Sequence, residues 1–386
     1  MQRFYTAEAV TEGHPDKLCD LIADSVLDEC LKYDPESRVA CEVLATQGKV
    51  LAAGEITSTH EPYVFGIMEK VLQAAGYDPK KFVLDALIHK QSVDIAAAVS
   101  KSKEKRVGLA CNQTDWENGA GDQGVMIGYA CNETPQLMPM PVVLANRIVR
   151  ELSACRRSGY IQGILSDGKA QVTVEYDSGV PKRLEAVVVS CQHVEDKSMR
   201  RLEAEIRERV LIPALRLLPP DENTKIFINP SGRFVCGGLD ADTGLTGRKL
   251  MVDSYGGIVP HGGGAFSGKD CSKVDRSAAY MARYIAKNMV AAGLASRCQV
   301  SLAYAIGVAQ PVMVEVDTFG TGTACADDCL AAAIPLVFGL TPKQIIDGLH
   351  LKRPIFRQTA VFGHFGRKEF PWERTDKVGQ LRDTIL

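Results

Sequence analysis

Residues 15–56 read PDKLCDLIADSVLDECLKYDPESRVACEVLATQGKVLAAGEI, and this stretch decides the fold. Its first half has apolar residues at helical spacing, namely Leu18, Leu21, Ile22 and Val26. The spacing predicts a helix from Pro15 to about Lys32. Two strand-like runs follow, Val39 to Ala45 and Val50 to Ile56, on either side of a turn at residues 47–49. The stretch therefore predicts a helix followed by a β-hairpin.

The same order of elements occurs three times along the chain. In the first unit a second helix is expected from about Glu61 to Ala75. The second unit is expected to have helices over about 142–157 and 198–211 and strands over 170–176 and 184–190. The third is expected to have helices over 273–292, 326–337 and 342–349 and strands over 299–307 and 312–319. A further short strand is expected after each unit, over 82–89, 224–229 and 355–361.

These units predict an α+β fold of three similar helix–hairpin–helix–strand domains in a pseudo-threefold arrangement, with helices covering one face of each sheet. The domains are predicted over residues 13–100, 136–237 and 270–386. Because the residue identities do not repeat between units, three unrelated α+β segments are the alternative. The segments between the units are rich in glycine and polar residues, and loops held by a rigid scaffold are where chemistry usually occurs.

Composition excludes several classes of protein. A chain of 386 residues, 46% apolar and 24% charged, is long enough for two or three folded domains. Its net charge of −2 argues against nucleic-acid binding, which needs a broad basic face. No apolar run reaches the ~18–20 residues of a membrane span, and the N-terminus lacks the apolar core of a secretory signal. The 12 cysteines are scattered singly. This pattern is typical of a protein in the reducing cytoplasm and not of one held together by a framework of disulfides.

Residues 263–269, GGAFSGK, have the Gly-x4-Gly-Lys spacing of a phosphate-binding loop. Glycines allow backbone N–H groups to approach phosphate oxygens, and Lys269 adds a positive charge. The segment departs from a Walker A loop, because Asp270 occupies the usual Ser/Thr position and no hydrophobic strand precedes it. We predict an anion-binding loop of another kind, with a flexible glycine connector as the alternative.

Other segments combine cations with carboxylates. Arg248 and Lys249, next to two glycines, are suited to phosphate binding, and an ordinary tight turn is the alternative. His14 and Lys17, at the start of the first helix, are suited to meet an anion. Asp16 is suited to hold Mg²⁺, whereas helix capping alone also explains an acid there. Several separated cations with metal-binding acids together predict a site for a polyphosphate.

The remaining candidates are less informative singly. Asp122 lies in a glycine loop, and Asp167 and Lys169 lie at an expected turn before a strand. Glu42 and Glu55 lie on strands, where a solvated face is the alternative to a functional role. The sequence presents no Ser-His-Asp or Cys-His arrangement, so no nucleophile needs a base.

Six longer motifs occur along the chain in a fixed order. They are residues 11–17 (TEGHPDK), 119–124 (GAGDQG), 244–249 (GLTGRK), 262–270 (GGGAFSGKD), 273–280 (KVDRSAAY) and 363–367 (GHFGR). With these motifs the chain resembles, from end to end, the S-adenosylmethionine synthase (methionine adenosyltransferase) family.

The resemblance implies synthesis of S-adenosyl-L-methionine from ATP and L-methionine. The methionine sulfur attacks C5′ of ATP and expels tripolyphosphate, which is then hydrolysed to phosphate and diphosphate. A thioether has no proton to lose, so the difficulty lies in stabilising the charged leaving group and aligning sulfur with C5′. The resemblance also implies interleaved domains, two Mg²⁺ and one K⁺ per site, and a homodimer with shared active sites that pairs into a homotetramer.

The resemblance assigns the site residues one by one. The catalytic residues are expected to be His14, Lys169, Arg248 and Lys269. ATP and its phosphates are expected to contact His14, Asp167, Lys169, Phe234, Asp242, Arg248, Lys249, Ala265 and Lys269, with Phe234 stacked on adenine. Methionine is expected near Glu55, Gln91, Asp122, Asp242 and Lys273. Mg²⁺ is expected at Asp16 and Asp275, and K⁺ at Glu42.

The chain departs from the family pattern in one region. The stretch between Glu55 and Gln91 is shorter than usual, and residues 95–118 form a longer stretch rich in Ala and Lys. In the family the segment at about 92–118 is a mobile gate over the active site, so the departure affects gating and substrate entry. Within it, residues 101–106 are expected to form a solvated mobile loop.

Two other functions remain open on the sequence alone. The first is a phosphotransferase or plain ATPase with a degenerate phosphate loop, which would give ADP as its main product. The second is a non-catalytic relative that serves as a regulatory subunit. The retained charged residues argue against the second function, namely Asp16, Lys169, Lys269 and Asp275.

Overall fold

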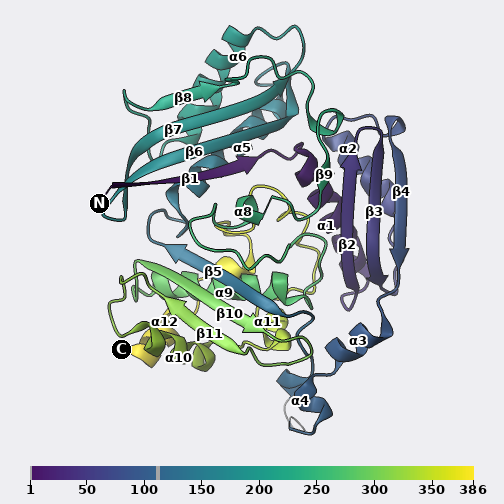
Figure 1. The fold of residues 1–386 in the computed structure, drawn as a ribbon, viewed down its shortest axis with the longest axis vertical. Coiled ribbons are helices and arrows are strands. Elements are labelled where there is room, and N and C mark those ends of the chain that lie inside the picture. The colour runs from purple at the N-terminus through teal and green to yellow at the C-terminus, as the bar shows by residue number, and fades with distance from the viewer. Residues whose placement is uncertain (1, 110–113) are drawn as a thin grey trace.

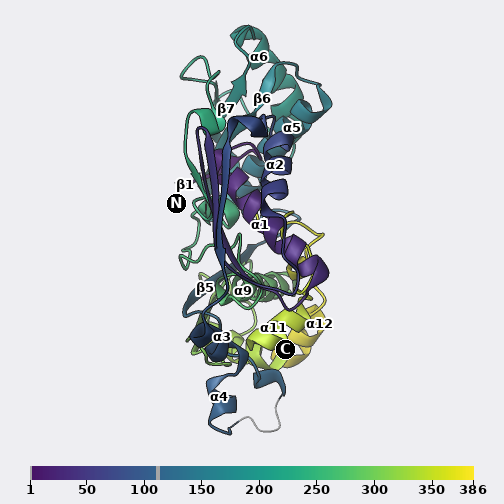
Figure 2. The same ribbon diagram turned by 90° about the vertical axis from the view of Figure 1, so that its right-hand side faces the viewer.

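The computed structural model describes residues 2–109 and 114–386. These residues form three β-sheets, and helices cover one face of each sheet (Figure 1 and Figure 2). In Figure 1 the sheets lie around a central region of loops that contains the short helix α8 (Leu250–Asp253). The prediction of three α+β parts is therefore confirmed.

The sheet of the first unit has the strand order β4-β3-β2-β9. Its strands are β2 (Arg38–Thr46), β3 (Lys49–Thr57), β4 (Val83–His89) and β9 (Gly244–Leu245). The helices of this unit are α1 (Pro15–Tyr33) and α2 (Val64–Ala74). Helix α2 begins three residues later than predicted, because Pro62 disfavours a helical conformation in the residue before it.

The sheet of the second unit has the strand order β1-β6-β7-β8. Its strands are β1 (Gln2–Val10), β6 (Ile164–Asp177), β7 (Val180–His193) and β8 (Lys225–Ile228), and its helices are α5 (Met140–Ser158), α6 (Met199–Ile206) and α7 (Ile212–Ala214). A π-helical turn at Arg207–Leu211 interrupts the helix predicted over 198–211. The turn precedes Pro213, which has no N–H to donate to the helix.

The sheet of the third unit has the strand order β11-β10-β5. Its strands are β5 (Gly124–Cys131), β10 (Arg297–Tyr304) and β11 (Met313–Asp317), and its helices are α9 (Val274–Ala291), α10 (Asp327–Val337), α11 (Pro342–Gly348) and α12 (Val378–Ile385). The strand predicted over 355–361 is wrong, because this described stretch consists of turns. The backbone N–H groups of Phe356 and Arg357 donate instead to Asp28 on α1, both at 2.9 Å.

The predicted gate segment contains helices α3 (Val93–Ser100) and α4 (Lys103–Arg106). The expectation of a loop over 101–106 is therefore wrong for residues 103–106, which are helical, although Lys101, Lys103 and Arg106 are exposed to solvent. Ser102 is buried and caps α4, and both carboxylate oxygens of Glu104 accept the N–H of Ala309 at 3.1 Å. These contacts anchor the segment to the third unit. Residues 110–113 of the predicted gate lie outside the described residues.

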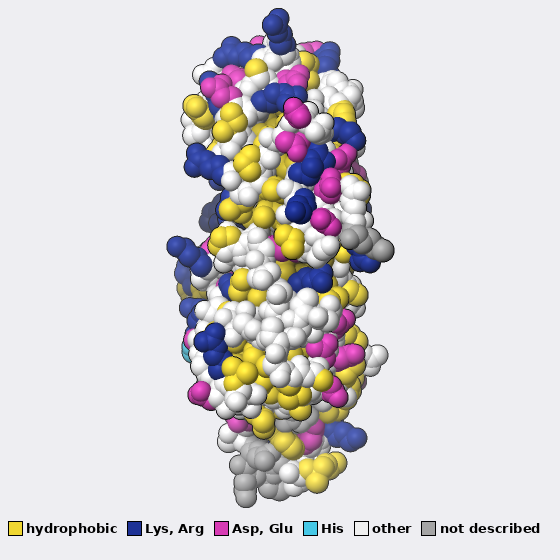
Figure 3. Space-filling view, turned by 90° about the vertical axis from the view of Figure 1, so that its left-hand side faces the viewer, with side chains coloured by type: hydrophobic (Ala, Val, Ile, Leu, Met, Phe, Trp, Pro, Cys, Tyr) yellow, Lys and Arg dark blue, Asp and Glu magenta, His cyan; other side chains and the backbone are white. Residues whose placement is uncertain are grey.

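The molecular surface has charged side chains of both signs. Figure 3 shows Lys and Arg side chains interspersed with Asp and Glu on one face, in keeping with the small net charge. Within the described residues, no single helix is long and apolar enough to cross a membrane, and α10 with α11 meets the length and composition only as a pair bent by 73°.

Close packing of α9 on β5 holds the core of the third unit together. Helix α9 is buried along almost its whole length. A Cβ atom at Gly128 of β5 would lie 2.0 Å from the carbonyl carbon of Ala282 on α9, which is closer than atoms can pack. Only glycine lets the two backbones approach this closely.

We therefore expect Gly128→Ala to lower the free energy of unfolding by roughly 1–3 kcal/mol, measured by urea denaturation, because the added methyl group forces strand and helix apart. Gly348→Ala is the matched control, because a Cβ there meets open space. Equal stability of the two variants would contradict the close packing of α9 on β5.

Candidate active site

The N-terminal end of α1 gathers several of the predicted phosphate-binding residues. The Nδ1 atom of His14, the N-cap, accepts the N–H of Asp16 at 3.2 Å. The Asp16 carboxylate is fully buried and lies 2.6 Å from Nζ of Lys249 and 3.2 Å from Nε of Arg248. It also accepts the backbone N–H of Leu245 at 3.0 Å. The structure thus brings the His14 motif and the 244–249 loop together.

Burial and neighbouring charges set the protonation of this group. Burial lowers the pKa of His14 to about 4, and the charges of Lys249 and Lys169 act in the same direction. Burial alone raises the pKa of Asp16, but the hydrogen bonds from Lys249 and Leu245 outweigh it and hold that pKa below its ordinary value. At neutral pH the site therefore contains a neutral imidazole and an ionised carboxylate.

Lys17 does not belong to the group of residues around His14. Its side chain is fully buried, and its Nζ atom contacts Asp20 at 2.9 Å and also Asp253. Burial lowers the pKa of Lys17, but the two carboxylates outweigh burial and raise it above its ordinary value. The expectation that Lys17 meets an anion is therefore wrong, because carboxylates inside the protein already neutralise its charge.

Three further candidates border the group around His14. Asp167 on β6 is buried, which raises its pKa, and its carboxylate accepts the N–H of Gly238 at 2.8 Å. The backbone N–H of Asp242 donates to the carbonyl of the same glycine at 3.0 Å. Lys169 lies 3.9 Å from Glu8, and the charges of Lys169 and Asp242 both act on the pKa of His14, in opposite directions.

Phe234 and Ala265 lie on the loops around this group. The backbone N–H of Phe234 donates to Nε2 of His193 at 3.1 Å, which fixes the loop that carries the Phe234 ring. A Cβ atom at Gly247 would lie 2.5 Å from the Cβ of Ala265. The 262–270 loop therefore packs directly on the 244–249 loop.

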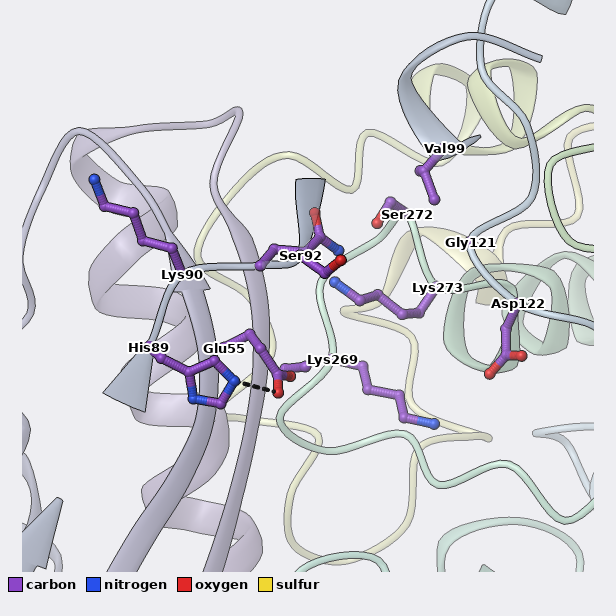
Figure 4. Close-up of a pocket in the computed structure, with 12 residues that line it drawn as sticks. Glu55, His89, Lys90, Ser92, Val99, Gly121, Asp122, Lys269, Ser272 and Lys273 are labelled. Atoms are coloured by element: carbon purple, nitrogen blue, oxygen red, sulfur yellow. Dashed lines mark ion pairs between the residues drawn. The ribbon is translucent and has the colours of Figure 1, made fainter. Parts of the chain in front are cut away.

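A cavity of about 380 Å³ lies between the ends of β3 and β4 and the loop before α9 (Figure 4). It is lined by four of the predicted methionine-binding residues and by one phosphate-binding lysine, namely Glu55, Gln91, Asp122, Lys273 and Lys269. Glu55 lies 3.0 Å from Nε2 of His89 on the neighbouring strand. The cavity thus presents both carboxylates and ammonium groups.

Lys269 connects this cavity with the 262–270 loop. Its Nζ atom lies 2.5 Å from Oδ2 of Asp275, at the start of α9. A Cβ atom at Gly264 would lie 2.3 Å from Cγ of Asp275, so only glycine lets the loop pass over this carboxylate. Asp270 is buried, which raises its pKa, but its ion pair with Lys273 outweighs burial and lowers that pKa below its ordinary value. Asp270 thus holds a lysine where a Walker A loop has a hydroxyl group.

Two predicted residues lie apart from this cavity. Glu42 is exposed on β2, two residues beyond Ala40, which lines the cavity. In the described part of the chain, no ion pair or hydrogen bond of the Glu42 carboxylate is found. Asp242, assigned to both substrates, lies with the His14 group and does not line the cavity.

The site offers Mg²⁺ two separate carboxylates and no complete set of ligands. Among residues 2–109 and 114–386, no three His, Cys, Asp or Glu side chains form a ready metal cage. Asp16 and Asp275 each present one carboxylate that is paired with a lysine. Mg²⁺ commonly takes one or two carboxylates and completes its shell with phosphates and water. The residues therefore suit a metal that arrives with a polyphosphate.

Sequence reasoning missed several residues that line the cavity, namely His89, Lys90, Ser92 and Ser272. Strand register is the signal that would have found one of them. Because β4 pairs parallel to β3, His89 lies directly opposite Glu55. Hydrophobic periodicity shows which face a residue occupies, but it does not show its partner on the next strand.

The structure thus has a group of cations at the start of α1 and a cavity lined by charges of both signs. Family models of S-adenosylmethionine synthetase match the chain in three parts: the N-terminal domain over residues 2–102, the central domain over 117–234 and the C-terminal domain over 236–374. The chain therefore belongs to the S-adenosylmethionine synthetase family. Members make S-adenosylmethionine from ATP and methionine and use metal ions, so the enzyme is a methionine adenosyltransferase.

The low pKa of His14 makes protein stability depend on pH. The pKa falls from its ordinary value of 6.5 to about 4 on folding, so the unfolded chain binds this proton more readily. We expect the free energy of unfolding to decrease as the pH falls from 6.5 towards 4. His14→Asn, which keeps a capping side chain, should remove this part of the decrease. Urea denaturation of both proteins at several pH values measures it, and identical slopes would contradict a neutral His14.

Proposed function

We propose that the enzyme binds ATP and L-methionine in one site and joins them by direct attack of sulfur on C5′ of ATP. A bond forms between sulfur and C5′, and the bond from C5′ to oxygen breaks, with its electron pair leaving on tripolyphosphate. The enzyme then hydrolyses tripolyphosphate to phosphate and diphosphate. The group of cations at the start of α1, together with a cavity lined by charges of both signs, is the observation that carries this proposal.

The polyphosphate end of the site would stabilise the leaving group. Because Nδ1 of His14 accepts a backbone N–H, the proton of the neutral ring lies on Nε2, which is then able to donate to the departing oxygen. Lys169, Arg248 and Lys269 supply positive charge that is in place before the reaction. The proposed ATP and phosphate contacts are His14, Asp167, Lys169, Phe234, Asp242, Arg248, Lys249, Ala265 and Lys269, with Phe234 stacked on adenine.

The cavity would hold methionine, which carries one ammonium and one carboxylate group. Glu55 and Asp122 are suited to the ammonium group, and Lys273 is suited to the carboxylate. Gln91 completes the lining, and we propose that Asp242 reaches methionine from the ATP side. Two fixed ends orient the sulfur, and orientation is a large part of the catalysis of a displacement.

We propose that Asp16 and Asp275 each hold one Mg²⁺ and that Glu42 holds one K⁺. Bound Mg²⁺ would neutralise part of the polyphosphate charge. The chain contributes by keeping the Asp16 carboxylate ionised and by placing Lys249 beside Asp16 and Lys269 beside Asp275.

We also propose that residues 92–118 form the gate of the site. Val99 of α3 lines the cavity, so this segment borders the substrate directly. When the gate moves, the hydrogen bonds between Glu104 and Ala309 would have to break, or Ala309 would have to move with the gate.

We propose a pseudo-threefold relation between domains over 13–100, 136–237 and 270–386, interleaved along the chain. Equivalent strand orders support it, because each hairpin has an edge strand from a distant segment on one side. In the described chain, the first and second sheets have a fourth strand that the third lacks.

A homodimer, which pairs further into a homotetramer, is the proposed assembly. The face of the first sheet away from its helices is apolar and exposed at Leu44, Val83 and Leu87, whose exposed fractions are 39%, 64% and 62%. By strand register, Glu55 and His89 lie on this same face. A second copy on this face would border the cavity, which supports an active site shared between subunits.

The decisive experiment is product analysis with ATP, Mg²⁺ and K⁺, with and without methionine. We expect methionine-dependent release of phosphate and diphosphate together with S-adenosylmethionine. ADP as the main product would favour a phosphotransferase or ATPase. No turnover by the purified protein, with stimulation of a partner enzyme, would favour a regulatory subunit.

We expect Lys269→Ala to lower turnover by about 100-fold or more, because it removes a fixed charge from the leaving group. The fold should survive, since this side chain contributes little to the core. Lys343→Ala is the control, because Lys343 pairs with Asp347 on the surface of α11. Steady-state assays and thermal unfolding measure both effects, and wild-type turnover in Lys269→Ala would remove this residue from the mechanism.

We expect Leu87→Asp to dissociate the dimer and to lower specific activity, because it places a charge on the apolar sheet face. Val180→Asp, at an exposed position of the second sheet, is the control. Light scattering after size exclusion and activity across a dilution series measure the effect. A wild-type monomer with activity independent of concentration would contradict the shared site.

A further inference from the structure

Helix α1 has four aspartates at intervals of four residues, namely Asp16, Asp20, Asp24 and Asp28. Residues four apart lie along one row of a helix. Each carboxylate accepts at least one backbone N–H group, at 2.8–3.0 Å, and together they bind three segments that are distant in the sequence. We call this row the aspartate row.

The first three positions of the row hold the two anion-binding loops. Asp16 accepts from Leu245, and Asp20 accepts from Gly247 at 2.9 Å, so two positions hold the 244–249 loop. Asp24 accepts from Gly268 at 2.8 Å and therefore holds the 262–270 loop. The two loops are thus set at a spacing fixed by the pitch of one rigid helix.

Buried cations lock the row in place. Arg276 forms two hydrogen bonds with Asp24, at 2.7 and 2.9 Å, and a third with the carbonyl of Lys269 at 3.1 Å. Lys17 bridges Asp20 to Asp253, which lies just beyond the 244–249 loop. The GHFGR motif supports Asp253, because the N–H of His364 donates to its carbonyl at 3.0 Å.

We propose that Asp20 and Asp24 are positioning residues for a polyphosphate site. Asp20 holds Lys249 in place through the 244–249 loop, and Asp24 holds Lys269 in place through the 262–270 loop. This inference rests on the proposed function. Stability alone does not explain the arrangement, because buried ion pairs contribute little net stability compared with apolar residues. Cations fixed in place, in contrast, lose little free energy to reorganisation when charge develops.

Asp28 provides an internal control. It holds Phe356 and Arg357 in the same way and on the same row, but the 355–357 segment carries none of the proposed site residues. A purely structural role predicts that Asp20 and Asp28 behave alike. A positioning role predicts that only Asp20 affects anion binding.

The test measures the affinity for inorganic tripolyphosphate in the presence of Mg²⁺, by calorimetry, for a double-mutant cycle of Asp20→Ala and Lys249→Ala. We expect Asp20→Ala to weaken binding by about tenfold and the double variant to be little weaker than the single variants. Asp28→Ala should leave the affinity unchanged and combine additively with Lys249→Ala.

Asp20→Asn separates positioning from stability. It keeps an oxygen acceptor for Gly247 but removes one of the two charges that neutralise buried Lys17. We expect lower stability with wild-type affinity for tripolyphosphate. If Asp20→Ala does not fold, Asp20→Ser replaces it in the cycle.

The outcomes distinguish the two proposals. No binding of tripolyphosphate by the wild-type protein would overturn the proposed function and the positioning role together. Binding by the wild type, with equal and additive effects of Asp20→Ala and Asp28→Ala, would overturn the positioning role alone.

Discussion

Charge buried along one side of α1 is the constraint on which the rest of the structure depends. A carboxylate away from water is stable only when hydrogen bonds and opposite charges surround it. Asp16, Asp20 and Asp24 obtain those partners from loops that are distant in the sequence, and the loops obtain a fixed position in return. The same contacts that satisfy the carboxylates of the helix therefore position the loops of the proposed anion-binding site. Fold and chemistry share one set of hydrogen bonds.

Hydrophobic periodicity predicted the layers of the fold well because it reports which face of an element is buried. The hairpins of the three units are present as β2–β3, β6–β7 and β10–β11. Prediction failed where polar contacts override local preference. Residues 355–361 are strand-like in composition, yet Asp28 takes their backbone N–H groups. Residues 101–106 are highly charged, yet Ser102 and Glu104 anchor them.

Motifs predicted the residue types of the site, but not the pairing between them. Lys17 and Lys249 were equivalent as cations in the sequence. Only the structure shows that Lys17 is enclosed between two carboxylates, whereas Lys249 is partly exposed and pairs with the buried Asp16. The sequence pattern did not predict that the row of aspartates on α1 is buried, because the polar side of a helix usually faces solvent. Here the polar side is buried as well.

The origin of the edge strands has a consequence for the integrity of the chain. Strand β1 completes the sheet of β6, β5 completes that of β10, and β9 completes that of β2. Two cuts, one between residues 102 and 117 and one between 234 and 236, would leave the two strands of each of these pairs on different fragments. Each fragment would expose an unpaired edge, which invites aggregation. None of the three parts is an autonomous module. A chimaera that exchanges one part between relatives would also have to exchange the edge strand that completes the sheet of that part.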